Sequence, residues 1–197
     1  MTDDELKLTT EKINLYVLGA LSSARYEHSV RVAVLARELC KRFGWIPESG
    51  YLAGLAHDMC KAGGDRLLFS LASQDGFPIT KLEKNKPALL HGRAAAVLLS
   101  TEFKILDESI LAAVRNHTFG TPGMDILGKI IFVADKIEPG RKGIDPMFRR
   151  KILSSELDEM VRLVLGENIR YLKSKGKEVA SETLLMFESL KGGPQKT

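Results

Sequence analysis

The chain has 197 residues, which suits one domain that can bury a core without disulfide staples. Apolar residues make up 44% and charged residues 27%, an ordinary globular composition. The net charge of +4 favours anionic ligands such as phosphates, but it is too small to indicate nucleic-acid binding.

The two cysteines, Cys40 and Cys60, form no CxxC pair, so a disulfide framework is not supported. Cys60 follows a histidine and an aspartate closely, yet we expect it to be a small buried hydrophobe. The first residues are acidic, and no apolar run approaches the length of a membrane span. We therefore expect a cytoplasmic protein with neither a membrane nor a nucleic-acid partner.

Low aromatic content and abundant Leu, Ala, Lys and Glu favour helices. The spacing of apolar residues predicts an all-α, single-domain helical bundle over residues 1–190 and a disordered tail over 191–197. Residues 73–87 read as a polar loop, a candidate lid over a site. After Pro146 we expect two helices that serve as scaffold or as a homodimer surface. The predicted helices cover about 9–21, 24–43, 47–62, 65–73, a stretch after His91, 107–117, 124–137, 157–172 and 178–190.

The chain has only four histidines, and each lies near other chemically suggestive residues. His28 lies on the apolar face of its predicted helix, where a lone histidine is more often an ordinary core residue than a ligand. His57 precedes Asp58 near the end of the next helix, and the other two are His91 and His117. An aspartate in the very apolar helix 124–137 must be paired, hydrogen-bonded or bound to metal, since its desolvation is costly. That residue, Asp135, completes a candidate set of six.

Four predicted helices thus each contribute an imidazole or a carboxylate, which is how helix bundles build metal sites. Imidazole and carboxylate without thiolate suit zinc, iron or manganese. Six candidate ligands exceed the needs of one tetrahedral site. They fit two ions bridged by one carboxylate, which could activate water and clamp a phosphoryl group.

Five segments carry a specific resemblance: RYEHS at 25–29, HDMCK at 57–61, LHG at 90–92, NHTFG at 116–120 and KIIFVADKIEPGR at 129–141. The chain resembles the HD-domain metal-dependent phosphohydrolases, and within them the YqeK subfamily, which hydrolyses diadenosine tetraphosphate symmetrically to two ADP. The resemblance implies an HD-domain bundle with its metal-site core at about 24–141. It also favours iron as the metal.

The resemblance further implies a role for each candidate residue. His28, His57, Asp58 and Asp135 would hold one metal ion, and Asp58 would bridge to a second ion held by His91 and His117. Water activated by the two ions would attack an inner phosphorus. Phosphate contacts are expected from Lys61 and Arg141, and more weakly from Arg25, while Thr118 and Gly120 would shape the pocket. We expect Asp58 and Lys61 to be the catalytic residues.

The chain departs from the subfamily pattern at Met59-Cys60, Ala95, Phe119 and Lys136, none of which is a ligand. Two alternatives stay open. One is another HD phosphohydrolase, acting on nucleoside monophosphates or guanosine alarmones. The other is a metal-bound nucleotide sensor without turnover.

Overall fold

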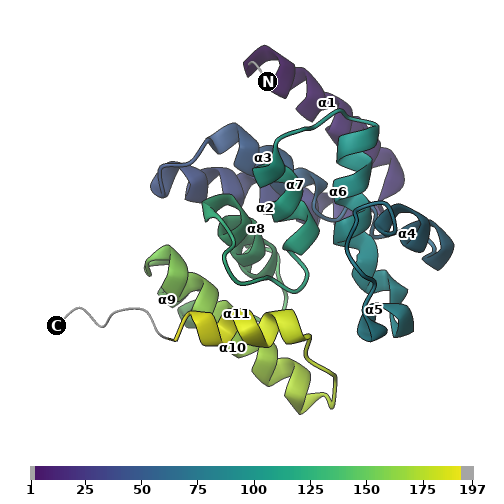
Figure 1. Ribbon diagram of the computed structural model, residues 1–197. Helices are drawn as coiled ribbons and strands as arrows, with labels where there is room; N and C mark the ends of the chain where they lie inside the picture. Colours follow the sequence, from purple (N-terminus) through teal and green to yellow (C-terminus); the bar gives the residue numbers. More distant parts are fainter. Residues whose placement is uncertain (1–2, 192–197) are drawn as a thin grey trace.

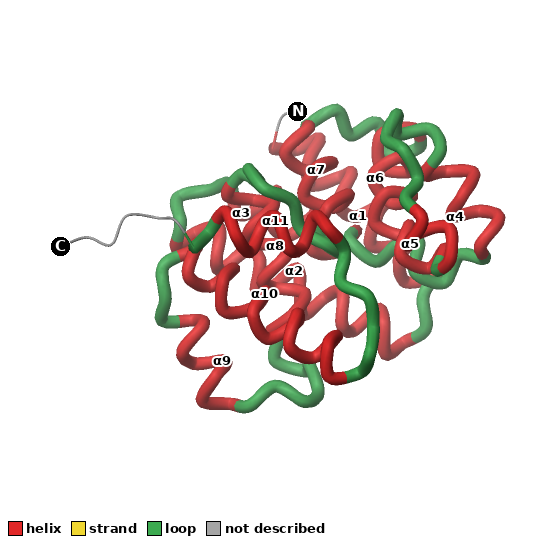
Figure 2. Tube along the Cα trace, turned by 60° about the horizontal axis from the view of Figure 1, so that its bottom comes forward, coloured by secondary structure: helices red, strands yellow, loops and turns green. Residues whose placement is uncertain are grey.

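The computed structural model describes residues 3–191, which form helices joined by turns and loops, with no strand among them (Figure 1, Figure 2). The all-α prediction is confirmed, whereas residues 192–197 of the predicted tail lie outside the described part. The helices, including the short 3-10 helix η1, are α1 (Asp3–Ala20), α2 (Ser23–Arg42), α3 (Pro47–Ala56), α4 (Asp65–Ala72), α5 (Lys81–Asn85), η1 (Pro87–Leu90), α6 (His91–Thr101), α7 (Glu108–Asn116), α8 (Ile126–Ile137), α9 (Pro146–Leu153), α10 (Leu157–Ser174) and α11 (Ser181–Ser189).

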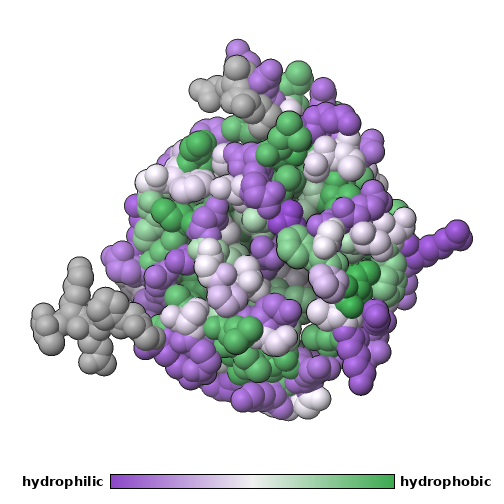
Figure 3. All heavy atoms as spheres, in the orientation of Figure 1, coloured by the Kyte–Doolittle hydropathy of each residue, from purple (hydrophilic) through white to green (hydrophobic). Residues whose placement is uncertain are grey.

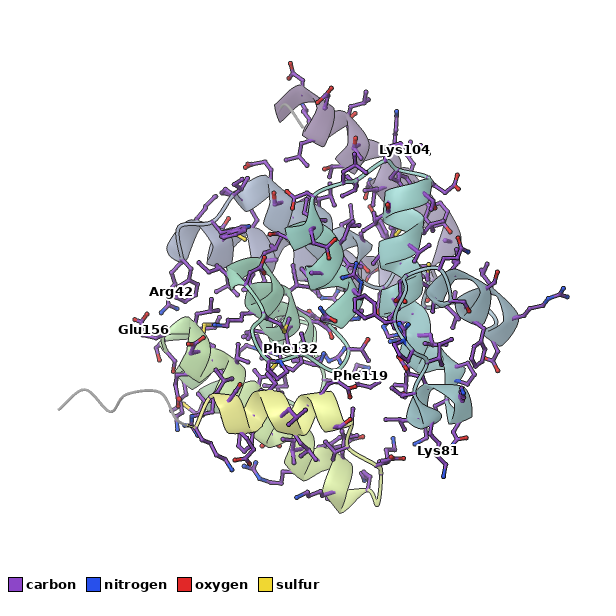
Figure 4. The ribbon with its side chains drawn as sticks, in the orientation of Figure 1. Arg42, Lys81, Lys104, Phe119, Phe132 and Glu156 are labelled. Atoms are coloured by element: carbon purple, nitrogen blue, oxygen red, sulfur yellow. The ribbon has the colours of Figure 1, made fainter. Side chains whose placement is uncertain are left out.

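Helix α8 lies at the centre of the molecule, where it contacts α2, α3, α7 and α10 (Figure 1). Its sequence is apolar on nearly every side, and a helix of that kind is stable only when it is surrounded by other elements. Phe132 is fully buried and is seen among these helices in Figure 4. Helix α8 therefore carries Asp135 into the interior, within reach of its neighbours.

Small residues allow helices α2 and α3 to approach each other closely. A Cβ atom on Gly54 would lie 2.7 Å from the Cα of Ala33, closer than such atoms can pack. The close crossing brings His28 of α2 and His57, just after α3, together with ring centroids 5.3 Å apart. Packing of two backbones thus places two candidate ligands side by side.

The structure differs from the predicted elements in four places. Helix α3 ends at Ala56 rather than at 62, because residues 57–62 form turns with backbone bonds between residues three apart, such as the N–H of Lys61 to the carbonyl of Asp58. Helix α1 begins at Asp3 rather than near residue 9, because Leu6 extends its buried face and acidic residues suit a helix N-terminus. The predicted loop 73–87 contains α5, whose start is fixed by a capping box between Thr80 and Glu83. Three helices follow residue 145, where two were predicted, since Asp145 caps α9.

Helices α10 and α11 lie side by side at one end of the molecule, where α10 packs against the central helix α8 (Figure 1). The Thr183 hydroxyl of α11 donates to the Phe119 carbonyl at 2.8 Å. Leu184 and Leu185 on the outer face are exposed, and an apolar patch covers α11 in Figure 3. Pairing of these helices between subunits stays a prediction. None of the described helices combines the length and apolarity that a membrane span requires.

Candidate metal centre

The structure brings together all six predicted ligands, from five different helical segments. His57 and His117 come directly after α3 and α7, and His91 begins α6. His28 lies within α2 and Asp135 within α8. Asp58, His57, His91, His117 and Asp135 are buried, and the rings of His57 and His91 each lie 4.9 Å from the ring of His117.

Three of the histidines are oriented by the same local bond. Nδ1 of His57, His91 and His117 lies 2.6 to 2.7 Å from the carbonyl oxygen three residues earlier, on Gly54, Ala88 and Val114. A carbonyl can only accept, so each Nδ1 carries the proton and each Nε2 presents a lone pair to the centre. This is the orientation that a metal-ligating histidine adopts.

The ligand atoms form two groups that share Asp58. Its Oδ1 lies 2.9 Å from Nε2 of His91 and 3.6 Å from Nε2 of His117. Its Oδ2 lies 3.9 Å from Nε2 of His57. Oδ1 of Asp135 lies 3.1 Å from Nε2 of His28 and 3.6 Å from Nε2 of His57. One carboxylate oxygen of Asp58 thus faces each group.

These residues fit divalent cations better than they fit a self-contained core. The Nε2 atoms of His91 and His117 face each other at 3.0 Å, both with lone pairs, which is repulsive unless a cation or proton lies between them. Nε2 of His57 and Oδ1 of Asp58 are buried without a hydrogen-bond partner. Core histidines would have such partners. Each of three ligand triplets has its atoms within 4.8 Å of one another.

The electrostatics favour the metal-binding charge states of several ligands. Burial lowers the pKa of His117 to about 3, so its imidazole is neutral at physiological pH. Burial alone would raise the pKa of Asp58, but the positive charge that the facing His57 carries when it is protonated outweighs it and holds that pKa well below its usual value. Lys136 and the histidines do the same for the pKa of Asp135. Both carboxylates are therefore ionised and available to cations.

Cationic side chains surround the two aspartates. Nζ of Lys61 lies 3.4 Å from Asp58 and 2.9 Å from Nε2 of His91, and burial lowers its pKa. Arg25 lies 3.8 Å from Asp58, and Arg141 lies 3.7 Å from Asp135. Three of the residues predicted to contact phosphate therefore stand at the rim of the candidate centre.

The other two predicted pocket residues differ from each other. The Thr118 hydroxyl lies 3.4 Å from Nε2 of His91, beside the centre. Gly120 has a φ of 71°, and a Cβ there would lie 2.5 Å from Sδ of Met186. Gly120 thus serves the docking of α11 at least as much as the pocket.

Glu138 and Lys136 were not assigned roles from the sequence. The Glu138 carboxylate is buried and accepts from Nδ1 of His28 at 3.1 Å and from Nε of Arg31 at 2.6 Å. Burial would raise the pKa of Glu138, but these two partners lower it. Lys136, one of the departures from the subfamily pattern, lies 2.6 Å from Asp135. The position of Lys136 directly after the predicted ligand Asp135 could have indicated this contact from the sequence.

Of the other departures, Met59, Cys60 and Ala95 are buried in the core. Burial raises the pKa of Cys60 to about 12, which fits the expected role of a small buried hydrophobe. Phe119, by contrast, lines a cavity that opens onto His91, His117 and Asp135. Only Phe119 and Lys136 among the departures therefore bear on what the centre binds.

That cavity has a volume of about 350 Å³ and lies between the metal-ligand residues and the C-terminal helices. Asn168 and Leu172 of α10 and Thr183 of α11 form one wall, and Leu82 of α5 and Leu89 of η1 form another. Helices α10 and α11 therefore do more than the scaffold role predicted for them. The segment predicted as a lid supplies a wall of the cavity.

Comparisons with known proteins show which family the chain resembles. The HD domain family model matches residues 25–140. The chain is 34% identical to the symmetrical bis(5'-nucleosyl)-tetraphosphatase of Bacillus subtilis (strain 168), over 88% of this chain and 92% of that protein. It is 30% identical to the protein of the same name from Staphylococcus aureus (strain NCTC 8325 / PS 47), over 90% of this chain and 92% of that protein.

A solved structure is also similar. A predicted HD superfamily hydrolase from Clostridium acetobutylicum, described as involved in NAD metabolism, superposes with a TM-score of 0.86 at 31% identity. The match covers 93% of this chain and 97% of that one. With the family model matching more than half of its length, the chain belongs to the HD-domain family, together with the symmetrical bis(5'-nucleosyl)-tetraphosphatases that it resembles over about nine tenths of its length.

Proposed function

We propose that the protein hydrolyses diadenosine tetraphosphate, or a closely related dinucleoside polyphosphate, symmetrically to two nucleoside diphosphates. The observation that carries the proposal is the convergence of four Nε2 atoms on two carboxylates, with Asp58 directing one oxygen to each group. Relatives named for this activity match nearly the whole chain, which supports the same substrate class here.

Two divalent ions would be held by His28, His57, Asp58 and Asp135 on one side, and by Asp58, His91 and His117 on the other. When bound, the ions would polarise phosphoryl oxygens and lower the pKa of a water molecule. Iron is the metal that the subfamily resemblance favours, while the donor set also suits manganese and zinc.

The chain's own side chains would bind and orient the anion. Lys61 lies next to Asp58 and Arg141 lies next to Asp135, and both line the cavity that the ligand cluster faces. Their charges would neutralise the polyphosphate as its inner phosphorus is attacked, and Arg141 can grip two oxygens at once. The leaving group is a nucleoside diphosphate, which is stable as an anion, so no strong protein acid is required.

The test is product analysis. The purified protein is incubated with diadenosine tetraphosphate and ferrous, manganous or zinc ion, and the nucleotides are separated by anion-exchange chromatography. Asp58→Ala removes the shared carboxylate and should abolish both turnover and binding of the metal pair. Asp65→Asn, at an exposed aspartate that begins α4, is the matched control and should keep both.

ADP as the sole product, lost in Asp58→Ala alone, supports the proposal. AMP together with ATP would contradict symmetrical cleavage. Bound metal without any hydrolysis would reject this substrate. A panel of nucleoside monophosphates and guanosine alarmones would then separate another phosphohydrolase from a nucleotide sensor.

A further inference from the structure

Three cavities adjoin one another along the candidate site. The central cavity, described above, contacts His91, His117 and Asp135. A second, here the Phe119 cavity, has a volume of about 410 Å³ and shares Leu89, Thr118 and Phe119 with the first. A third, here the Tyr171 cavity, has a volume of about 560 Å³ and shares Lys136, Arg141 and Asn168 with the first. The ligand cluster thus faces the middle member of three neighbouring cavities.

The central cavity has the charge of a polyphosphate site. Five cationic side chains line it, against the two carboxylates of Asp135 and Glu178. A linear chain of phosphates needs such positive charge along its length. The five cations are Lys61, Lys86, Lys136, Arg141 and Lys177.

The Phe119 cavity is different, because its cations are already paired. Arg93 lies 2.7 Å from Asp75, and Arg115 lies 2.8 Å from Glu108. The Arg115 guanidinium also lies 5.2 Å from the ring centroid of Phe77, at the same cavity. With Phe119 partly exposed, the cavity offers aromatic faces and, apart from the Glu182 carboxylate, little free charge, which suits a nucleobase.

The Tyr171 cavity also combines aromatic rings with balanced charge. Tyr171 and Phe148 line it, and Tyr171 is 52% exposed. Lys142 adds one cation to those shared with the central cavity, while Asp145 and Glu167 supply two carboxylates. Both outer volumes fall within the range of about 300 to 1,000 Å³ typical of small-molecule sites.

We propose that the substrate spans all three cavities, with one nucleoside in the Phe119 cavity and the other in the Tyr171 cavity. This inference rests on the proposed function and specifies its binding mode. With a base held at each end, the middle of the tetraphosphate lies over the ligand cluster. Symmetrical cleavage then follows from the positions of Phe119 and Tyr171, because two phosphates separate each nucleoside from the middle of the tetraphosphate chain.

Phe119 is one of the positions where the chain departs from the subfamily pattern, and Figure 4 shows it facing the space between α5 and α11. Its carbonyl accepts from Thr183 at 2.8 Å, which fixes the backbone on which the ring is carried. The ring therefore stands at the boundary of two cavities on a held backbone. A base that stacks on it would have its phosphates directed toward His91 and His117.

The test measures binding by calorimetry to protein saturated with Mn²⁺. One probe is the diadenosine tetraphosphate analogue with a methylene group in place of the central bridging oxygen. The other is the matching adenosine tetraphosphate analogue, which has a single nucleoside. Phe119→Leu and Tyr171→Leu each remove an aromatic ring but keep an apolar side chain. Tyr16→Leu, at a partly exposed ring of α1 outside the three cavities, is the control.

Each single variant should weaken the two-nucleoside probe about 10-fold, because one stacking contact is lost. The one-nucleoside probe should weaken only about twofold, since it can still use the other cavity. The double variant should weaken that probe about 10-fold as well. Tyr16→Leu should change neither affinity.

Equal loss of both probes in a single variant would overturn the inference, since it would place the ring in the fold or in the phosphate site. An unchanged affinity for the two-nucleoside probe would overturn the assignment of that variant's cavity. The proposed function fails separately, if wild-type protein does not hydrolyse diadenosine tetraphosphate while the analogue still binds and responds to the variants.

Discussion

Replacement of Glu138 by glutamine tests whether a buried carboxylate controls one metal-ligand residue. Only 1% of the Glu138 side chain is exposed, and it accepts from both Nδ1 of His28 and Nε of Arg31. Glutamine has the same shape but a single acceptor oxygen. If that oxygen accepts from Arg31, the amide NH₂ faces Nδ1 of His28. The imidazole must then move its proton to Nε2, which removes the lone pair from the centre.

The expected effect is large and confined to one group of ligands. Loss of a partner that orients a ligating histidine costs about 10- to 100-fold in metal affinity, which is about 1.4 to 2.8 kcal/mol. His91 and His117 keep their own backbone acceptors, so the site they form with Asp58 should retain its affinity. Manganese titration followed by electron paramagnetic resonance resolves the two sites by their separate affinities.

Glu27→Gln is the matched control, because Glu27 also lies near Arg31, at 3.8 Å, but is 63% exposed. An exposed ion pair of that kind contributes little, so the control should change metal affinity less than about twofold. The reasoning would be refuted by equal weakening of both sites in Glu138→Gln, or by the same loss in Glu27→Gln.

The remaining predictions concern stability. Burial lowers the pKa of His117 to about 3, whereas an unfolded chain has about 6.5. Between these values only the unfolded chain binds the proton, so stability falls as the pH drops below about 6.5. Urea unfolding of the metal-free protein should show the advantage of wild type over His117→Gln shrinking by about 1.6 kcal/mol from pH 6.5 to pH 5; a constant difference would contradict this. A Cβ on Gly92 would lie 2.9 Å from Cε1 of His117, so Gly92→Ala should cost about 1 to 3 kcal/mol. Gly19→Ala, with open space around the added Cβ, should raise the free energy of unfolding by up to about 1 kcal/mol. Equal melting temperatures of the Gly92→Ala and Gly19→Ala variants would contradict both predictions.

A residue could be assigned to the site from the sequence when its surroundings along the chain were enough to require a special partner. An aspartate in a very apolar helix requires compensation wherever the helix lies, so Asp135 could be singled out before any fold was known. The buried face of α10 was predictable for a similar reason, since its apolar residues recur with the period of a helix. In α2 the buried face lies to one side of the predicted stripe, because Ser29, Ala33 and Ala36 are buried while Leu35 is only half-buried.

Features that depend on where distant segments meet could not be found in this way. Glu138 lies 110 positions from His28 in the chain, and nothing in its local sequence indicates that partner. The walls supplied by α10 and α11 depend equally on tertiary packing. Helix α5 is a different case, because Thr80 and Glu83 have the spacing of a capping box and could have indicated its start.

Three of the histidines have a second task, which changes how inactive relatives should be recognised. In His57, His91 and His117, Nδ1 donates a hydrogen bond to a carbonyl in the last turn of a helical segment, where carbonyls otherwise lack a partner. Selection for folding alone would keep these imidazoles in a lineage that had stopped turning over substrate. Among the side-chain hydrogen bonds of residues 3–191, none joins the carboxylate of Asp58 or Asp135 to a backbone group. The partners of these two carboxylates are side chains of the centre and its rim, so neither aspartate completes a helix. In a relative that has lost catalysis, we expect the aspartates to be substituted first, while the three histidines are retained for their hydrogen bonds to helix carbonyls.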